Sequence, residues 1–282
     1  MNVTTIVLIH GLWTTALCWE HWLKHYADKG YYVIAPNWPG MEGDIEYLRH
    51  DPSSFAKVTL PAVIDHYEQV IRDLENPPLI IGHGFGGLIS QILLDRGWGA
   101  AGVAIAPAPF KGVFKAPLST LKIAFSALAN PSNSRGTSSL TPRKFRYAFA
   151  NTLSEAQALA AFERYAVPAP NRILLQAALT NFTPHAAATV NFRNETRAAL
   201  LLVAGGRDRV APSSLVKAHF DLYRDSKAET DYKEYPNQAH FTLLQDTRVA
   251  DYALGWALCR ANGSKLIAAS NQTDTWSVQL LT

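Results

Sequence analysis

The chain has 282 residues, of which 48% are hydrophobic and 17% are charged, a balance typical of a folded globular protein and not of a disordered one. Its 26 basic and 23 acidic residues give a net charge of +3, which is too even to indicate a nucleic-acid binder. Two cysteines are too few for a disulfide-rich scaffold or a cysteine-based zinc site. The sequence lacks the pattern of a secretory signal and has no apolar run long enough to span a membrane, so we expect a cytoplasmic protein without membrane contact.

Short apolar runs rich in Val, Ile and Leu predict strands, in chain order, at residues 5–9, 31–35, 79–81, 102–106, 200–204 and 232–235. Helical spacing of apolar residues is found at residues 17–29, 61–75, 85–96, 213–224 and 247–260. The middle strands are apolar on both faces, as strands of a covered parallel sheet are. This alternation predicts an α/β protein with a doubly wound, mostly parallel sheet.

One long interval interrupts the alternation. Residues 108–197 contain no convincing strand, and helices are expected there near residues 119–129, 142–150, 154–165 and 171–181. About 90 residues is far more than the usual connection of a few residues between elements. We therefore expect residues 108–197 to form a helical cap over the carboxyl end of the sheet. The core then comprises residues 1–107 and 198–261, and residues 262–282 form a polar tail.

The composition of this expected cap allows two interpretations. Between Pro107 and Ser154 the sequence has basic residues but no acidic one, which could attract an anionic substrate or simply form a solvated face. Its aromatic residues indicate a medium-sized apolar or aromatic ligand, or else the cap's own core. These residues are Phe110, Phe114, Phe125, Phe145, Tyr147, Phe149, Phe162 and Tyr165.

The most informative segment is a glycine-rich turn between the strand at residues 79–81 and the following helix. Gly82, Gly84 and Gly87 satisfy the dinucleotide-binding pattern G-x-G-x-x-G. That pattern also needs an acidic residue about 20 positions later, at the end of the next strand, and belongs on the first strand of its unit. Here the next strand ends at Pro107 without an acid, and the turn follows the third strand, so the dinucleotide interpretation is disfavoured.

The same turn also fits the nucleophile elbow G-x-S-x-G, a sharp strand-to-helix turn that needs small residues on both sides of the nucleophile. Gly82 and Gly86 supply these flanks, but Gly84 stands where the serine is expected. On the elbow interpretation, the backbone N–H groups of Leu12 (or Trp13) and Phe85 would form an oxyanion hole.

Two further residues support the elbow. Asp208 follows the strand at residues 200–204, and His240 lies between the last strand and the last helix. The order of elbow, acid and histidine along the chain is that of α/β-hydrolases. Cys18 is expected to be a core residue and not a displaced nucleophile.

From Ile6 to about Arg260 the chain resembles the α/β-hydrolase superfamily. More narrowly, it resembles a bacterial group of capped hydrolases, on the evidence of the segments HGLW, WPGMEGD, GHGFGG, NFTPHAA and AGGRDRVAP. The resemblance implies six strands in the spatial order 2-1-3-4-5-6, with a ligand crevice between strands 1 and 3. It also implies an ester- or lactone-type carbonyl hydrolase of a small molecule, with Asp208 and His240 catalytic and Gly84 at the nucleophile position. We expect no cofactor and no metal.

Because Gly84 has no hydroxyl, three functions remain open. The first is a hydrolase by descent that has lost its serine, naturally or by engineering. The second is a lyase, isomerase, cyclase or water-activating enzyme that uses the His240–Asp208 pair as base. The third is a non-catalytic ligand-binding protein, for which Asp208 and His240 would not be needed. His10, Trp13 and His83 are expected beside the substrate, where the two histidines could instead hold loops by hydrogen bonds.

Overall fold

The protein is described by a computed structural model that covers residues 4–262 except 110, 113–134, 184–185 and 245–246. The helix expected near residues 119–129, the aromatic residues Phe110, Phe114 and Phe125, and the tail from residue 263 onward lie outside the described residues.

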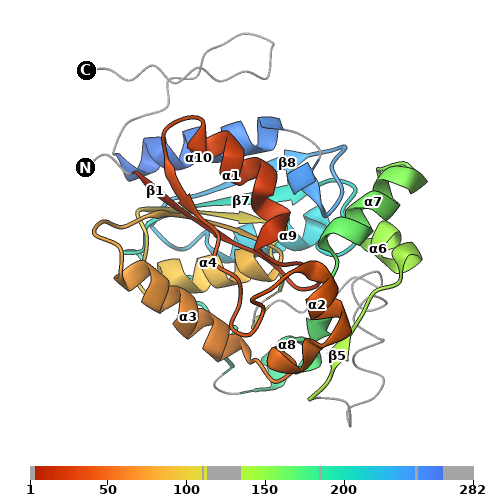
Figure 1. The fold of residues 1–282 in the computed structure, drawn as a ribbon. Helices are drawn as coiled ribbons and strands as arrows, with labels where there is room; N and C mark the ends of the chain where they lie inside the picture. Colours follow the sequence, from red (N-terminus) through yellow and green to blue (C-terminus); the bar gives the residue numbers. More distant parts are fainter. Residues whose placement is uncertain (1–3, 110, 113–134, 184–185, 245–246, 263–282) are drawn as a thin grey trace.

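A parallel six-stranded sheet forms the centre of the molecule (Figure 1). Its strands are β1 (Thr5–Ile9), β2 (Tyr32–Ile34), β3 (Leu79–His83), β4 (Ala101–Ile105), β7 (Ala199–Gly205) and β8 (Thr230–Tyr235). They lie in the order β2-β1-β3-β4-β7-β8, and all neighbouring pairs are parallel, which confirms the predicted fold class and strand order. The chain places β2 on one side of β1 and β3 on the other. The topological switch point, where the strand order changes direction, therefore lies between β1 and β3.

Helices cover both faces of the sheet. Figure 1 shows α1 (Glu20–Ala27) and α10 (Thr247–Ala261) on one face, and α3 (Leu60–Arg72), α4 (Phe85–Asp95) and α9 (Ser213–Leu222) on the other. All five were predicted, because each carries an apolar face that packs on the sheet. The six-residue helix α2 (Ile45–His50) was not predicted, since less than two turns gives no clear periodicity.

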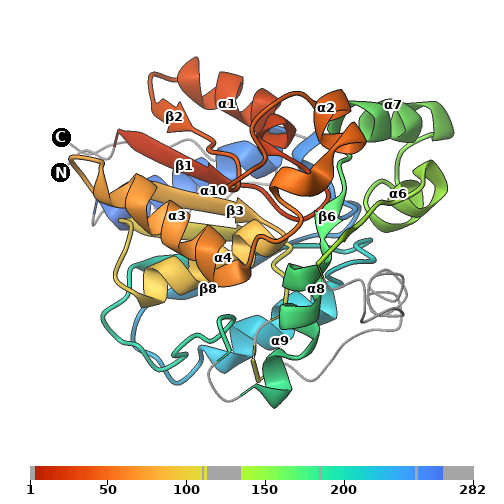
Figure 2. The same ribbon diagram turned by 60° about the horizontal axis from the view of Figure 1, so that its bottom comes forward.

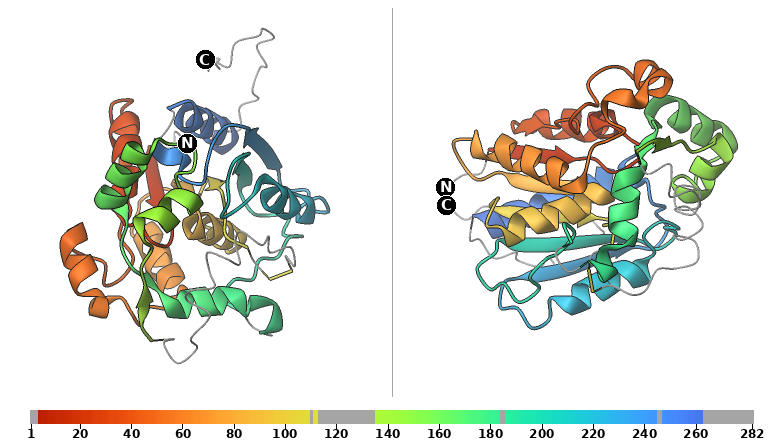
Figure 3. Two further views of the ribbon diagram at one scale, coloured as in Figure 1. Left: turned by 90° about the vertical axis from the view of Figure 1, so that its right-hand side faces the viewer. Right: turned by 90° about the horizontal axis from the view of Figure 1, so that it is seen from below.

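Between β4 and β7 the chain makes a long insertion, which we define as residues 108–197. Its described part contains α6 (Pro142–Ala148), α7 (Glu155–Tyr165) and α8 (Asn171–Ala178). It also contains an antiparallel pair of two-residue strands, β5 (Thr137–Ser138) and β6 (Ala169–Pro170), which differs from the expectation of helices alone. Two residues are too few to show an alternating pattern. Figures 2 and 3 show these helices gathered at one end of the sheet.

Candidate active site

Gly84 joins β3 to α4 in a sharp turn. Its backbone has φ +58° and ψ −117°, a conformation that residues with side chains rarely adopt. The turn is held by hydrogen bonds from Gly84 N to Ile105 O and from Ala108 N to Gly84 O, both 2.9 Å. A strained strand-to-helix turn at this place is the geometry of a nucleophile elbow.

The first turn of α4 packs very closely on the end of β1. A Cβ atom on Gly86 would lie 1.9 Å from Ile9 O, so only glycine permits this approach. The approach brings the N-terminus of α4 beside the loop that follows β1. Within the described part of the chain, the backbone N–H groups of Leu12, Trp13 and Phe85 donate to no other residue. They are thus available to a ligand oxygen, as an oxyanion hole requires.

Asp208, in the loop after β7, and His240, in the loop after β8, form a buried pair. His240 Nδ1 lies 2.7 Å from Asp208 Oδ2, and the two residues are 3% and 5% exposed. The other carboxylate oxygen accepts hydrogen bonds from the N–H groups of Val210 and Ala211 at 2.7 and 2.8 Å. An ionised carboxylate only accepts, so Nδ1 carries the proton and Nε2 keeps a free lone pair.

The Nε2 atom of His240 faces the elbow. A Cβ atom built on Gly84 would lie 3.5 Å from Nε2 and 3.9 Å from Gly11 Cα, which are ordinary contact distances. A serine side chain would therefore fit at position 84, with its hydroxyl within reach of the imidazole. The structure brings together Gly84, Asp208, His240 and the loop after β1, as the sequence predicted for a catalytic site.

His83 and His10 hold the loops around the site. His83 Nε2 donates to the backbone carbonyl of His240 at 2.8 Å, and the two rings are 4.7 Å apart. Burial, and to a lesser extent His240, lowers the pKa of His83 to about 3, so its ring is neutral. His10 Nδ1 donates to Gly11 O at 2.9 Å, and its Nε2 accepts from Trp38 N at 3.2 Å.

His10 was expected beside the substrate, and the structure places it elsewhere. The described residues that line the cavity include Trp13 and His83 but not His10. The reason is that both ring nitrogens of His10 bond to the backbone and its ring stacks on Trp38, with 5.0 Å between centroids. Burial lowers the pKa of His10 to about 4, which keeps it neutral.

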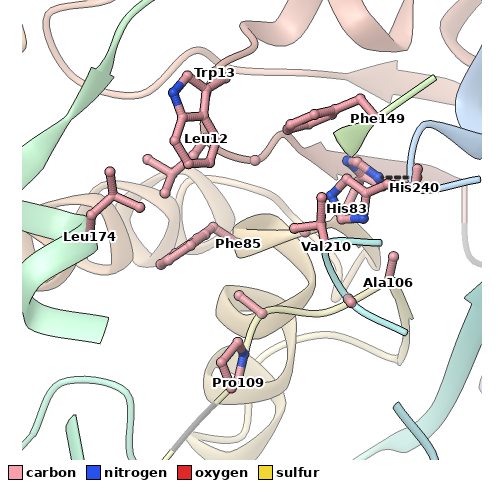
Figure 4. A pocket seen from close by; sticks show the side chains of 14 residues that line it. Leu12, Trp13, His83, Phe85, Ala106, Pro109, Phe149, Leu174, Val210 and His240 are labelled. Atoms are coloured by element: carbon pink, nitrogen blue, oxygen red, sulfur yellow. Dashed lines mark hydrogen bonds between the residues drawn. The ribbon is translucent and has the colours of Figure 1, made fainter. Parts of the chain in front are cut away.

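A cavity of about 70 Å³ lies above Gly84. Figure 4 shows Leu12, Phe85 and Leu174 on one side of this space and His83 and His240 on the other. None of the described residues of its wall is an Asp, Glu, Lys or Arg. Sequence reasoning missed Leu174, Val210 and Pro109 as wall residues, because only the folded chain brings them to the elbow.

Other kinds of site find no support in the described residues. They contain no group of three or more His, Cys, Asp or Glu side chains that could hold a metal ion. Cys18 is buried in the core, and burial raises the pKa of its thiol. No helix among these residues is long and apolar enough to cross a bilayer.

Comparison with known proteins gives the family. The sequence profile described as "Alpha/beta hydrolase family" matches residues 6–252. The chain belongs to the α/β-hydrolase family. A comparison with curated proteins found no significant match.

Solved structures of α/β hydrolases share the fold. A monoacylglycerol lipase from Paleococcus ferrophilus is 17% identical with a TM-score of 0.64, and the match covers 91% of this chain and 94% of that one. An extracellular α/β-hydrolase from a Paenibacillus species is 21% identical with a TM-score of 0.61, covering 90% and 98%. A methylesterase from Arabidopsis is 14% identical with a TM-score of 0.60, covering 89% and 98%.

Proposed function

We propose that this α/β hydrolase is an ester- or lactone-type carbonyl hydrolase by descent, in which the His240–Asp208 pair acts on water because Gly84 supplies no hydroxyl. The observation that carries the proposal is the position of His240 Nε2. It belongs to a buried ring whose other nitrogen bonds to Asp208, and it lies 3.5 Å from the place where a Cβ of residue 84 would lie. The named activities of the lipase and the methylesterase with the same fold also favour an ester carbonyl as the reacting group.

The proposed reaction needs no covalent intermediate. His240 Nε2 accepts a proton from water while the water oxygen bonds to the carbonyl carbon. The N–H groups of Phe85 and of Leu12 or Trp13 hold the oxygen that becomes negative. The bond to the leaving oxygen then breaks, and His240 returns the proton to that oxygen. Asp208 keeps the proton on Nδ1 and stabilises the imidazolium while it exists.

The rate is expected to be low. Hydrolases of this kind that have lost the serine still accelerate the reaction on the order of 10³–10⁴-fold over the uncatalysed reaction in water. An intact triad accelerates it by more than about 10⁶-fold. We expect small, uncharged acyl groups to be preferred, because the described wall of the cavity is apolar and the cavity holds only about 70 Å³.

The test is hydrolysis of short activated esters by the unmodified chain and by His240→Gln. We expect slow, saturable hydrolysis that His240→Gln lowers to the residual rate given by the oxyanion hole and binding alone, while circular dichroism shows both proteins folded. Hydrolysis that does not depend on His240 would contradict the proposal. Exchange of a substrate carbon-bound hydrogen with solvent, dependent on His240 and without ester cleavage, would support the lyase or isomerase alternative instead. Ligand binding in the cavity without either reaction would support a non-catalytic protein.

A further inference from the structure

Basic residues beside the catalytic cavity differ in their partners from many of those in the core. In the core, Arg96 pairs with Glu68 at 2.7 Å. Lys24 likewise pairs with Asp28 at 2.7 Å. Among the described residues, by contrast, no carboxylate forms an ion pair with any of five exposed basic residues in α6 and in the loop after β7. We call these five residues the basic patch: Arg143, Lys144, Arg146, Arg207 and Arg209.

The two segments that carry the basic patch are joined to each other. The guanidinium of Arg209 lies over the ring of Tyr147 in α6, with 4.6 Å from Cζ to the ring centroid. The Nδ2 atom of Asn151, just after α6, donates a hydrogen bond of 3.1 Å to Arg207 O. The same two segments also supply Phe149 and Val210 to the cavity wall. The basic patch therefore borders the catalytic cavity.

The charge of the basic patch is not balanced by its own segments. The sequence has no acidic residue between Pro107 and Ser154, and the loop after β7 has only Asp208. The carboxylate of Asp208 is buried and bonded to His240. Glu155 and Glu163 of the neighbouring α7 form no ion pair with the basic patch. An anion bound here would thus balance an excess of positive charge.

The cavity itself limits where the anion can lie. The described wall of the cavity has no Asp, Glu, Lys or Arg, and its volume is about 70 Å³, so it suits a small uncharged acyl group. A charged group of the same substrate must then lie outside, on the alcohol part of the ester. Arg209 is well placed to receive it, because a guanidinium that stacks through its face on Tyr147 keeps the N–H groups of its edge for carboxylate or phosphate oxygens.

We propose that the basic patch binds an anionic group of the substrate, so that the site prefers esters of a small uncharged acid with an alcohol that carries a carboxylate or a phosphate; this inference rests on the proposed function. The patch contributes to binding and not to bond breaking, so the preference appears in KM. One exposed ion pair strengthens binding about 1.5- to 5-fold, and two or three together about 10-fold. Salt screens such charges and should remove the preference.

The experiment compares three butyrate esters of phenols that differ only in the meta substituent. They are 3-(butyryloxy)benzoate, 3-(butyryloxy)phenyl phosphate and the neutral 3-(butyryloxy)benzamide. Each rate is divided by the rate without protein, which corrects for the leaving group. We expect kcat/KM about 10-fold higher for at least one anionic ester than for the neutral ester at low salt, through a lower KM, and nearly equal values in about 0.5 M NaCl. The two anionic esters show whether the patch takes a carboxylate, a phosphate or both.

Arg209→Met removes the charge and keeps most of the aliphatic stem. We expect it to lower the preference for the anionic ester about 3- to 5-fold and to leave the neutral ester unaffected, whereas Arg209→Lys should retain most of the preference. The matched control is Arg224→Met, an exposed arginine between α9 and the amino end of β8, which should change neither. If Arg209→Met does not fold, Arg146→Gln takes its place.

The outcomes separate this inference from the function on which it rests. Hydrolysis that depends on His240 but shows no preference for either anionic ester, or a preference that salt and Arg209→Met leave unchanged, overturns the inference and keeps the hydrolase. If no ester is hydrolysed, calorimetry with the amide analogues 3-butyramidobenzoate and 3-butyramidobenzamide decides. Tighter binding of the anionic analogue, lost in Arg209→Met, supports the basic patch without the hydrolase, and equal binding overturns both.

Discussion

The backbone N–H of Val167 donates a hydrogen bond of 3.0 Å to the backbone carbonyl of Trp13, and so joins the insertion to the loop after β1. The indole Nε1 of Trp13 donates to Ser138 O, also at 3.0 Å, on the neighbouring strand β5. Trp13 has φ +62°, a strained conformation that costs about 1–3 kcal/mol and persists only where the surroundings hold it. The insertion therefore helps to fix the backbone that we expect to form the oxyanion hole.

The first prediction concerns the Trp13 side chain. Trp13→Phe keeps an aromatic ring but removes the donor to Ser138, so the loop should hold its N–H groups less firmly. We expect kcat for ester hydrolysis to fall about 5- to 10-fold, as loss of about 1 kcal/mol of hydrogen bonding implies, with little change in KM.

The matched control for this prediction is Trp256→Phe, which also removes an indole hydrogen bond, from Nε1 to Asp231 at 2.7 Å, in α10. This variant should lower Tm without lowering kcat. Equal effects of the two variants on kcat would show that Trp13 acts only through stability.

The second prediction concerns a hydroxyl at position 84. Gly84→Ser should react with fluorophosphonate probes, whereas the unmodified chain should form no adduct. It should also hydrolyse short activated esters at least about 10²-fold faster. The φ of +58° should lower the stability by about 1–3 kcal/mol, visible as a lower Tm. Gly84→Ala bears the same strain without the hydroxyl and should not react. A folded Gly84→Ser protein that stays inert would contradict the assignment of the elbow.

The third prediction concerns stability in acid. Burial lowers the pKa of His10 to about 4 and the pKa values of His83 and His219 to about 3, all from 6.5. Below pH 6.5 the unfolded chain binds protons at these residues that the folded chain does not, so the folded state loses stability as pH falls. With three such groups, the free energy of unfolding falls by about 4 kcal/mol for each pH unit once all three are protonated in the unfolded chain. Urea unfolding at pH 7, 6 and 5 measures this loss.

The control for the acid effect is His219→Leu, because His219 lies in α9 and not in the cavity wall. Removing one of the three groups should reduce the slope of stability against pH by about one third. An unchanged slope would contradict the assignment of this effect to buried neutral histidines.

The sequence predicts the parts of this fold that follow from periodicity. The central strands and the five core helices were found because each shows an apolar run or an apolar face, and the order of Gly84, Asp208 and His240 indicated their meeting point. The elements α2, β5 and β6 are too short for such a signal. The wall residue Leu174 is brought to the cavity by tertiary packing alone, and no local pattern marks it. For His10 the sequence left two roles open, beside the substrate or holding a loop, because a histidine after a strand does not show which backbone groups its ring will meet.

The last prediction follows from the two hydrogen bonds that Asp208 Oδ1 accepts from the N–H groups of Val210 and Ala211. In Asp208→Asn these donors hold the amide oxygen in the place of Oδ1, so the amide NH₂ must face His240 Nδ1. Nδ1 then has to accept, and the ring proton moves to Nε2, where it faces position 84 and blocks the base. We expect fluorophosphonate labelling of Gly84→Ser to fall about 10³–10⁴-fold when Asp208→Asn is added, as in other triads with the wrong tautomer. Nitrogen NMR of labelled histidine reports the tautomer directly, and a proton that stays on Nδ1 in this variant would refute the orientation argued for the amide.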